Sequence, residues 1–327
     1  MTAALTREKF RAMGTSCAVA VTAEPLDAES VSAALAAARR EVAACEQALS
    51  RFDAQSDLSR LNRANGDWVT VNERLIEALE AALRWRVDTG GRFDPTILPA
   101  LTAAGYDRSF ELLTERAPRP LDHWRAWSRV EVDPTAGRAR LDRGAAVDLG
   151  GIGKGFSATR ALQAMCTAWP ELTGALVDLG GDIAVWGAAP EGGPWRVDIA
   201  DSRTMGRLAG TLVLSGGGVA TSGRDARRFG PGGRLHHLID PATGLPADAG
   251  PLSVTVVAPT ATEAEAHATA LAVADVDVAR AHLVLRPHLS ALLIPHEGEP
   301  IIVGALPLAP ERARVEFVIT TQGGRFQ

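Results

Sequence analysis

Apolar side chains recur at spacings of three and four over residues 28–49, at Val31, Leu35, Ala38, Val42, Cys45 and Leu49. This period matches one face of an amphipathic helix, so we expect a long helix there. A second helix is expected to start after Asn72, a good N-cap residue, and to end at Gly90-Gly91. The two helices are expected to pack together.

Short apolar and β-branched runs predict strands elsewhere in the chain, mainly in its second half. The runs lie at 15–22, 129–149, 175–179, 195–199, 210–214, 219–221, 252–257, 283–303 and 314–320. Residues 51–65, in contrast, are polar and irregular.

Two more helices are expected, over 154–169 and from Thr260 to about residue 274, where Thr260 and Glu263 form a capping-box pattern. Strands and helices do not alternate regularly, which favours an α+β class. We therefore expect residues 1–327 to form a single mixed unit with a β-rich C-terminal half and flanking helices. Residues 276–327 are interpreted as a β-rich tail of the same unit.

The composition is that of a globular protein, with 46% hydrophobic and 22% charged residues. A net charge of −5 and the lack of a basic stripe argue against nucleic acid as a partner. Neither a signal peptide nor a run of about 18 apolar residues is visible, so we expect a cytoplasmic protein without an integral membrane segment. Three cysteines without a CxxC pair predict reduced, buried thiols.

Residues 236–246 set two histidines and an aspartate beside a tight turn. Asp240 can bond its own backbone, Pro241 presets φ, and Gly244 can adopt a positive φ. Such a turn would hold His237 and Asp240 in defined positions. By itself the pattern is ambiguous, because a histidine beside a turn of this kind is as often structural as functional.

A corner with four glycines, residues 150–155, follows a predicted strand and precedes a predicted helix, where backbone amides can approach a phosphate. It is not a P-loop, because Asp148 and Gly155 stand where glycine and Ser or Thr are required. It fits a dinucleotide fingerprint better, with Asp178 as the acidic residue about 25 positions on. The helix-poor second half, however, argues against a doubly wound sheet. Lys154 within the corner suits a phosphate partner.

Glu265 and Thr269 stand four residues apart, so one helix face presents both side chains. Their oxygen atoms would favour Mg²⁺ over Zn²⁺. From this helix alone, the better interpretation is that Glu265 merely complements the helix dipole, so the helix does not by itself establish a metal site. His267 points away from that face and is expected to be structural.

Two classes of hydrolase are disfavoured by spacing. His236 and His237 lack the i, i+4 separation and the glutamate of a zinc-binding helix. Ser222 lacks the flanking glycines of a nucleophile elbow.

Taken together and in order, these motifs resemble the FAD:protein FMN transferase family, the ApbE-like flavin transferases. The matching segments are 13–15, 49–62, 93–96, 148–155, 177–182, 221–223, 237–244 and 253–257, followed by the helix with Glu265 and Thr269. The resemblance implies a Mg²⁺-dependent enzyme that cleaves FAD, attaches FMN through a phosphoester to a Thr or Ser of a target flavoprotein, and releases AMP.

The resemblance also implies roles for single residues. FAD contacts are implied for Met13, Phe52, Arg92, Phe93, Asp94, Asp148, Lys154 and Ile239. Metal contacts are implied for the Gly151 carbonyl, Glu265 and Thr269, with a backbone contact from Ala268. His237 and Asp240 would lie by the pyrophosphate, with His237 as the candidate general base.

One departure from the family concerns Glu265, where the family usually has Asp, so this longer side chain must reach the metal differently. Two alternative functions stay open on sequence grounds. One is an FAD pyrophosphatase that uses water as the nucleophile, and the other is a flavin-binding protein without turnover.

Overall fold

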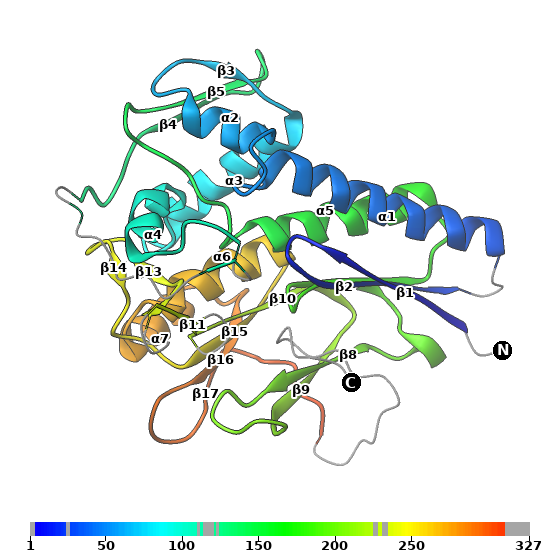
Figure 1. Cartoon of the computed structure of the whole chain (residues 1–327). Helices are drawn as coiled ribbons and strands as arrows, with labels where there is room; N and C mark the ends of the chain where they lie inside the picture. Colours follow the sequence, from blue (N-terminus) through cyan, green and yellow to red (C-terminus); the bar gives the residue numbers. More distant parts are fainter. Residues whose placement is uncertain are drawn as a thin grey trace.

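The structure, a computed structural model, describes residues 4–23, 27–109, 112–113, 121, 124–224, 228–230 and 235–310. Its centre is an eight-stranded antiparallel sheet, which confirms the α+β class (Figure 1). In spatial order the strands are β1 (Ala4–Ala12), β2 (Thr15–Ala23), β6 (Gly174–Leu179), β7 (Ile183–Gly187), β10 (Gly216–Gly223), β15 (Ser253–Ala258), β16 (Ser290–Ile294) and β17 (Ile301–Val303).

Helices α1 (Ala28–Leu49) and α5 (Gly153–Ala168) cover the first half of this sheet. The predicted apolar stripe from Val31 to Leu49 is buried. Its part from Val31 to Val42 packs with β2, β6 and α5. Asp27 caps α1 by accepting hydrogen bonds from the backbone N–H groups of the first turn. The helix expected over 28–49 is confirmed.

Helices α6 (Ala261–Ala272) and α7 (Val276–Val284) cover the other half of the sheet, against β15 and β16. Thr260 is the N-cap of α6 and accepts from the Glu263 N–H at 3.2 Å, as predicted. The segment 283–303 was expected to be strand-like, but its first two residues form the end of helix α7. The strand expected over 314–320 lies outside the described residues.

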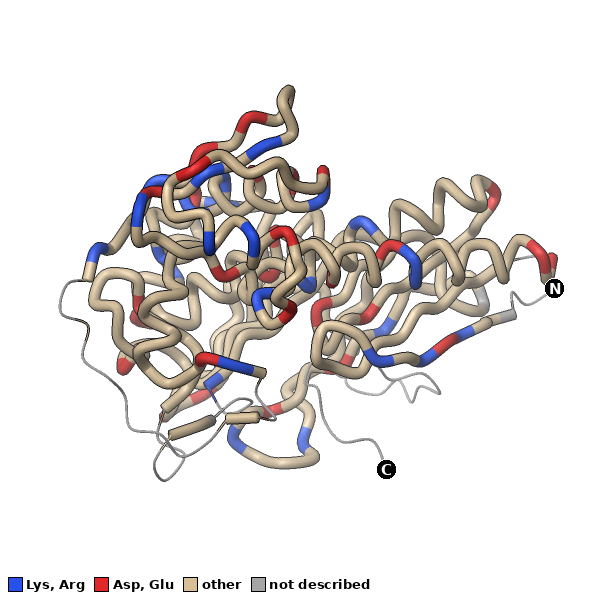
Figure 2. The backbone as a smooth tube through the Cα atoms, turned by 45° about the horizontal axis from the view of Figure 1, so that its top comes forward, with Lys and Arg blue, Asp and Glu red and all other residues tan. Residues whose placement is uncertain are grey.

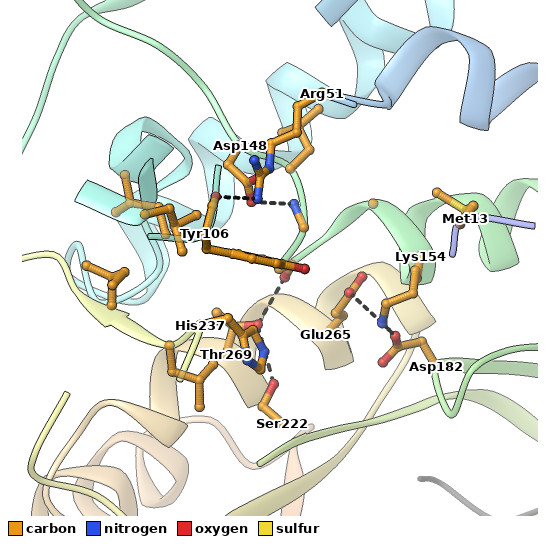
Figure 3. Close-up of a pocket in the computed structure, with 18 of the residues that line it drawn as sticks. Met13, Arg51, Tyr106, Asp148, Lys154, Asp182, Ser222, His237, Glu265 and Thr269 are labelled. Atoms are coloured by element: carbon orange, nitrogen blue, oxygen red, sulfur yellow. Dashed lines mark hydrogen bonds and ion pairs between the residues drawn. The ribbon is translucent and has the colours of Figure 1, made fainter. Parts of the chain in front are cut away.

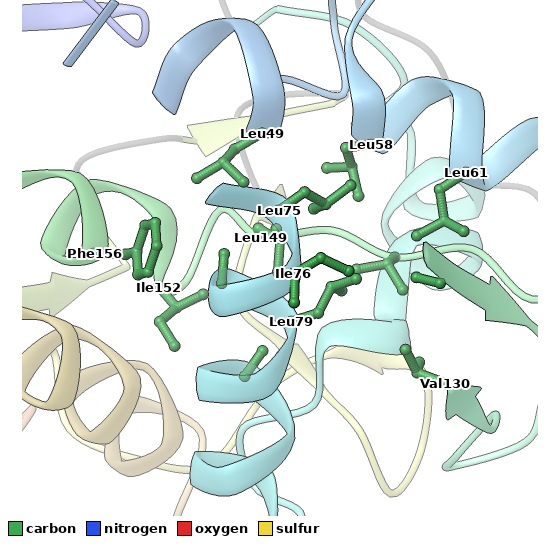
Figure 4. Packing of buried hydrophobic residues seen from close by; sticks show 14 of the residues in the cluster. Leu49, Leu58, Leu61, Leu75, Ile76, Leu79, Val130, Leu149, Ile152 and Phe156 are labelled. Atoms are coloured by element: carbon green, nitrogen blue, oxygen red, sulfur yellow. The ribbon is translucent and has the colours of Figure 1, made fainter. Parts of the chain in front are cut away.

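A smaller layer lies at the upper left of Figure 1, next to the C-terminal end of α1. It contains α2 (Asp57–Arg63), α3 (Glu73–Asp88) and a sheet of β3 (Val69–Thr70), β5 (Arg138–Leu141) and β4 (Val130–Asp133). Leu58, Leu61, Leu75 and Leu79 form its core (Figure 4). The irregular segment expected over 51–65 was therefore partly wrong, because Ser56 caps α2 there. Residues 145–149, expected to be the end of a strand-like run, belong to neither a strand nor a helix.

The opposite face of the central sheet is covered by the pair β8 (Trp195–Ala200) and β9 (Leu208–Leu214), whose apolar side chains pack on β6, β7 and β16. Short elements complete the described chain: η1 (Pro95–Ile97), α4 (Leu98–Ala104), η3 (Pro190–Gly192), β11 (Arg228–Phe229), β12 (Leu235–His236), β13 (Ile239–Asp240) and β14 (Leu245–Pro246).

Acidic and basic positions are interspersed along the backbone (Figure 2). Among the described residues, none of the helices has both the length and the apolar character needed to cross a bilayer.

Candidate active site

A cavity of about 530 Å³ is lined by segments that lie far apart in the sequence, from Met13 to Val273 (Figure 3). Its volume is in the range of small-molecule sites. Twelve residues predicted from the sequence line it: Met13, Phe52, Arg92, Phe93, Asp94, Asp148, Gly151, Lys154, His237, Ile239, Glu265 and Thr269. Two predicted residues, Asp240 and Ala268, are not among the lining residues.

Met13 reaches the cavity from the turn between β1 and β2. Met13 and Gly14 have φ values of 51° and 68°, and Ala12 pairs with Thr15 on either side of them. Two positive φ angles are typical of a type I′ hairpin turn. The Met13 N–H donates to Glu46 Oε1 of α1 at 2.7 Å, which fixes this turn against the helix.

Arg51 and Tyr106 are lining residues that the sequence analysis missed. The Arg51 guanidinium carbon lies 4.1 Å from the ring centroid of Phe52 and 4.8 Å from that of Tyr106. Its Nε is 2.5 Å from Asp148 Oδ2, and both side chains are largely buried. A buried guanidinium stacked on aromatic rings and paired with a carboxylate holds one end of the cavity rigid.

The loop after α3 brings Arg92, Phe93 and Asp94 to the cavity. Asp94 Oδ1 accepts from the Thr96 N–H at 2.8 Å, and Asp94 Oδ2 accepts from Arg86 Nε at 3.2 Å. Burial raises the pKa of the Asp94 carboxyl in spite of these bonds. Asp94 therefore orders the loop as well as lining the cavity.

The glycine corner places the start of α5 against α6. A Cβ on Gly155 would lie 2.2 Å from the Ala261 carbonyl oxygen, so only glycine permits this approach. The Gly155 N–H donates to Glu265 Oε2 at 2.7 Å. Glu265 is thus the anion at the N-terminus of α5, where the helix dipole favours a negative charge.

Oxygen atoms from the corner and from α6 meet at this end of the cavity. Thr269 Oγ1 donates to the Gly151 carbonyl at 3.2 Å, and Ser222 Oγ lies 3.4 Å from Thr269 Oγ1. A Cβ on Gly151 would lie 2.9 Å from Thr269 Cγ2, so glycine permits the close approach of the Thr269 side chain. Oxygen-only donors roughly 3 Å apart suit an octahedral Mg²⁺ with bonds of about 2.1 Å. The residues present therefore fit a magnesium ion.

Lys154 lies between two carboxylates at the same end of the cavity (Figure 3). Its Nζ forms an ion pair with Asp182 Oδ2 and lies 3.2 Å from Glu265 Oε1. Asp182 is 3% exposed. It ends the segment 177–182 that resembles the family, but it was not among the predicted site residues. Its position after the two glycines of that motif is a signal that could have found it.

His237 and Asp240, which were predicted to act together, have different roles in the structure. Asp240 Oδ1 accepts from the Ala242 N–H at 2.9 Å, and the Asp240 carbonyl accepts from the Gly244 N–H at 2.8 Å. The carboxylate of Asp240 therefore forms the turn, as its sequence predicts. His237 lines the cavity, with its ring 6.5 Å from the ring of Tyr106, edge to face.

His236 and Asp178, which the sequence analysis considered as candidates, make structural contacts with the backbone. His236 Nε2 lies 3.1 Å from the Ala247 carbonyl. Asp178 Oδ1 accepts from the Gly181 N–H at 2.8 Å and is not a lining residue. Because the sheet is antiparallel, the dinucleotide fingerprint was a chance match, and the doubly wound fold is excluded.

Comparisons with known proteins agree with this architecture. Residues 13–293 match the sequence model of the ApbE family. An FAD:protein FMN transferase of Treponema pallidum is 36% identical over 280 residues, 78% of this chain and 76% of that protein. One of Salmonella typhimurium is 30% identical over 261 residues, 77% of this chain and 73% of that protein.

Solved structures share the fold. The crystal structure of the ApbE protein of Thermotoga maritima matches with a TM-score of 0.79 and 28% identity, covering 92% of this chain and 97% of that one. The flavinyl transferase ApbE of Pseudomonas stutzeri, at 22% identity, has the same fold with a TM-score of 0.77, covering 94% of this chain and 95% of that one. The expected enzyme class, a transferase, is confirmed by these relatives. The chain therefore belongs to the ApbE family.

Proposed function

We propose that this protein is a Mg²⁺-dependent FAD:protein FMN transferase that links FMN to a Thr or Ser of a target flavoprotein and releases AMP. The observation that carries the proposal is the meeting of Lys154 with the oxygen atoms of Gly151, Glu265 and Thr269 at one end of the cavity. The remainder is lined by aromatic and apolar side chains together with polar ones such as Arg51 and Asp148, a mixture that suits a flavin nucleotide. The relatives' shared name supports this function.

In the proposed reaction the acceptor hydroxyl oxygen bonds to the phosphorus on the FMN side of the pyrophosphate. The bond from that phosphorus to the bridging oxygen breaks, and the oxygen leaves with AMP. His237 takes the hydroxyl proton, since it is the imidazole in the lining, whereas Asp240 holds the turn that positions it. Lys154 binds a phosphate oxygen. Mg²⁺, held by Gly151, Glu265 and Thr269, would supply charge neutralisation.

The sequence-based assignment of a single unit over residues 1–327 stays a proposal. It is supported by β16 and β17, since these strands extend the same sheet as β1 and β2. The backbone contact proposed for Ala268 is supported only by its place on α6 between the other donors.

The test is to incubate the protein with FAD, Mg²⁺ and a target bearing an acceptor Thr, and to measure masses. A gain of one FMN on the target supports transfer, provided a Thr→Val target gains nothing. AMP with free FMN would instead indicate an FAD pyrophosphatase, and intact bound FAD a carrier. His237→Gln should abolish the gain. His236→Gln is the matched control, because His236 is not a lining residue and its Nε2 lies 3.1 Å from the Ala247 carbonyl.

A further inference from the structure

Lys154 is paired with the carboxylate of Glu265, which is proposed to bind the metal. Its ammonium pairs with Asp182 and lies 3.2 Å from Glu265 Oε1 (Figure 3). Glu265 Oε2 already accepts the Gly155 N–H. Both oxygens of the Glu265 carboxylate are thus engaged by the protein itself, and a cation that binds there must displace or share one of these partners.

The charges at this end of the cavity do not balance. Glu265 and Asp182 are each 3% exposed and carry two formal negative charges against the single charge of Lys154. Buried charges are costly unless they are paired, and one ammonium can offset the two carboxylates only in part. The remaining negative charge favours the binding of a cation beside Glu265, whereas the positive charge of the Lys154 ammonium opposes that binding.

The type of the basic residue is informative. Of the 34 Lys and Arg residues, Lys9 and Lys154 are the only lysines. A lysine carries a compact charge on a flexible stem, whereas an arginine forms a planar fork that holds carboxylates in place. A lysine at position 154 can therefore change partners within the cavity, and the side chain is already 19% exposed toward it.

We propose that Lys154 is the resident counter-ion of the Glu265–Asp182 pair, and that a divalent cation arriving at Glu265 releases its ammonium toward the pyrophosphate of FAD. Asp182 is then a positioning residue, since it holds Lys154 in reach of both. The inference rests on the proposed function and deepens it. Because one event prepares the other, Mg²⁺ and FAD should each tighten the binding of the other by the same factor.

The first experiment is a calorimetric titration with Mg²⁺ in the absence of FAD. Lys154→Met should lower the Mg²⁺ Kd about tenfold and should reduce the mutual tightening of Mg²⁺ and FAD. Lys154→Arg, which keeps the charge, should not show the gain. Asp182→Asn should weaken Mg²⁺, because it removes negative charge and leaves the ammonium to Glu265. An unchanged or weaker Mg²⁺ affinity in folded Lys154→Met would overturn the proposal.

The second experiment uses the unaltered protein, so it does not depend on a variant that folds. Protein labelled with isotopes only in lysine should give two side-chain NMR signals, and Lys9→Arg assigns the one from Lys154. Adding Mg²⁺ should shift the Lys154 signal, and adding FAD should shift it again, while Lys9 stays still. A Lys154 signal that Mg²⁺ does not move, in a protein that binds Mg²⁺, contradicts the release.

The two proposals can fail separately. FMN transfer to the target with a stationary Lys154 signal would refute the release and leave the function intact. A moving Lys154 signal without FMN transfer would support the counter-ion role and refute the transferase. Absence of any Mg²⁺ binding would refute the release and would remove the metal from the proposed function.

Discussion

The two faces of helix α6 place polar groups in opposite situations. Glu265 and Thr269 face the cavity, where their oxygen atoms can exchange partners with a cation and a substrate. His267, on the other face, is fully buried, and its Nδ1 lies 3.0 Å from His282 Nε2. One helix, half of whose residues are alanine, therefore has an open face with Glu265 and Thr269 and a closed face with His267.

The closed face could be mistaken for a metal centre. Asp88, His267 and His282 each offer a ligand atom within 4.8 Å of the others. Asp88 Oδ2, however, accepts from Arg286 Nε at 2.7 Å and lies 3.4 Å from His267 Nε2. A guanidinium already neutralises the carboxylate, so the group is a chain of polar contacts that ties α3, α6 and α7 together. Ligand type alone therefore does not make a metal site, because the ligand atoms must also be able to exchange their partners.

The largest effect is expected on the open face. Glu265→Gln keeps an oxygen for the Gly155 N–H but loses the charge, so Mg²⁺ affinity should fall about 100-fold and FMN transfer with it. Stability should change little, because the shape is retained. Glu263→Gln is the matched control on the same helix, since its carboxylate pairs with His288 outside the cavity. Calorimetry measures the Mg²⁺ affinity, and the mass assay measures FMN transfer. A Glu265→Gln variant that keeps its activity would show that Glu265 is not a metal ligand.

The next effect concerns the closed face and should reverse this pattern. His282→Ala leaves the buried ring of His267 without its 3.0 Å partner, which should cost about 2–3 kcal/mol in the free energy of unfolding. Mg²⁺ affinity should be unchanged. Urea denaturation measures the loss, and His282→Gln, which can still hydrogen-bond, should lose less. If His282→Ala weakened Mg²⁺ as strongly as Glu265→Gln does, the two faces would not be independent.

Acid should destabilise the closed face. Burial lowers the pKa of His282 from 6.5 to about 4, and the charge of Arg286 adds to the shift. Between these values the unfolded chain binds the proton and the folded one does not, so the free energy of unfolding should fall as the pH drops from 6.5 toward 4 and level off above 6.5. His282→Gln should flatten this slope in urea denaturation, whereas exposed His296→Gln should leave it unchanged. Equal slopes in both variants would contradict the assignment.

The sequence predicted those elements whose signals are local. Helices α1 and α3 have apolar stripes and side-chain caps, and both begin and end within one or two residues of the expected positions. Helix α2 was missed because seven residues carry too short a stripe to stand out from a polar segment, although Ser56 is a capping residue. The end of α7 was predicted to be a strand, because a short apolar run does not distinguish a helix from a strand.

The candidate site was predictable only through the order of its motifs. None of the segments around Met13, Lys154 or Glu265 identifies a cavity alone, and twelve predicted residues meet there because the fold joins them. Arg51 was missed because its role depends on Asp148, nearly a hundred positions away. Asp240 shows the converse, since its turn was predicted and the same turn uses its carboxylate.

The smallest effect is expected at the edge of the closed face. Arg286 Nε donates to Asp88 Oδ2, and Arg286 Nη1 donates to the His282 carbonyl at 3.1 Å. Because the Asp88 side chain is 40% exposed, solvent screens this pair, and Arg286→Met should cost only about 1 kcal/mol. The loss should shrink in high salt, and FMN transfer should be retained. Exposed Arg280→Met on α7 is the matched control. A loss as large as that of His282→Ala would mean that the guanidinium, and not the pair of imidazoles, holds the closed face together.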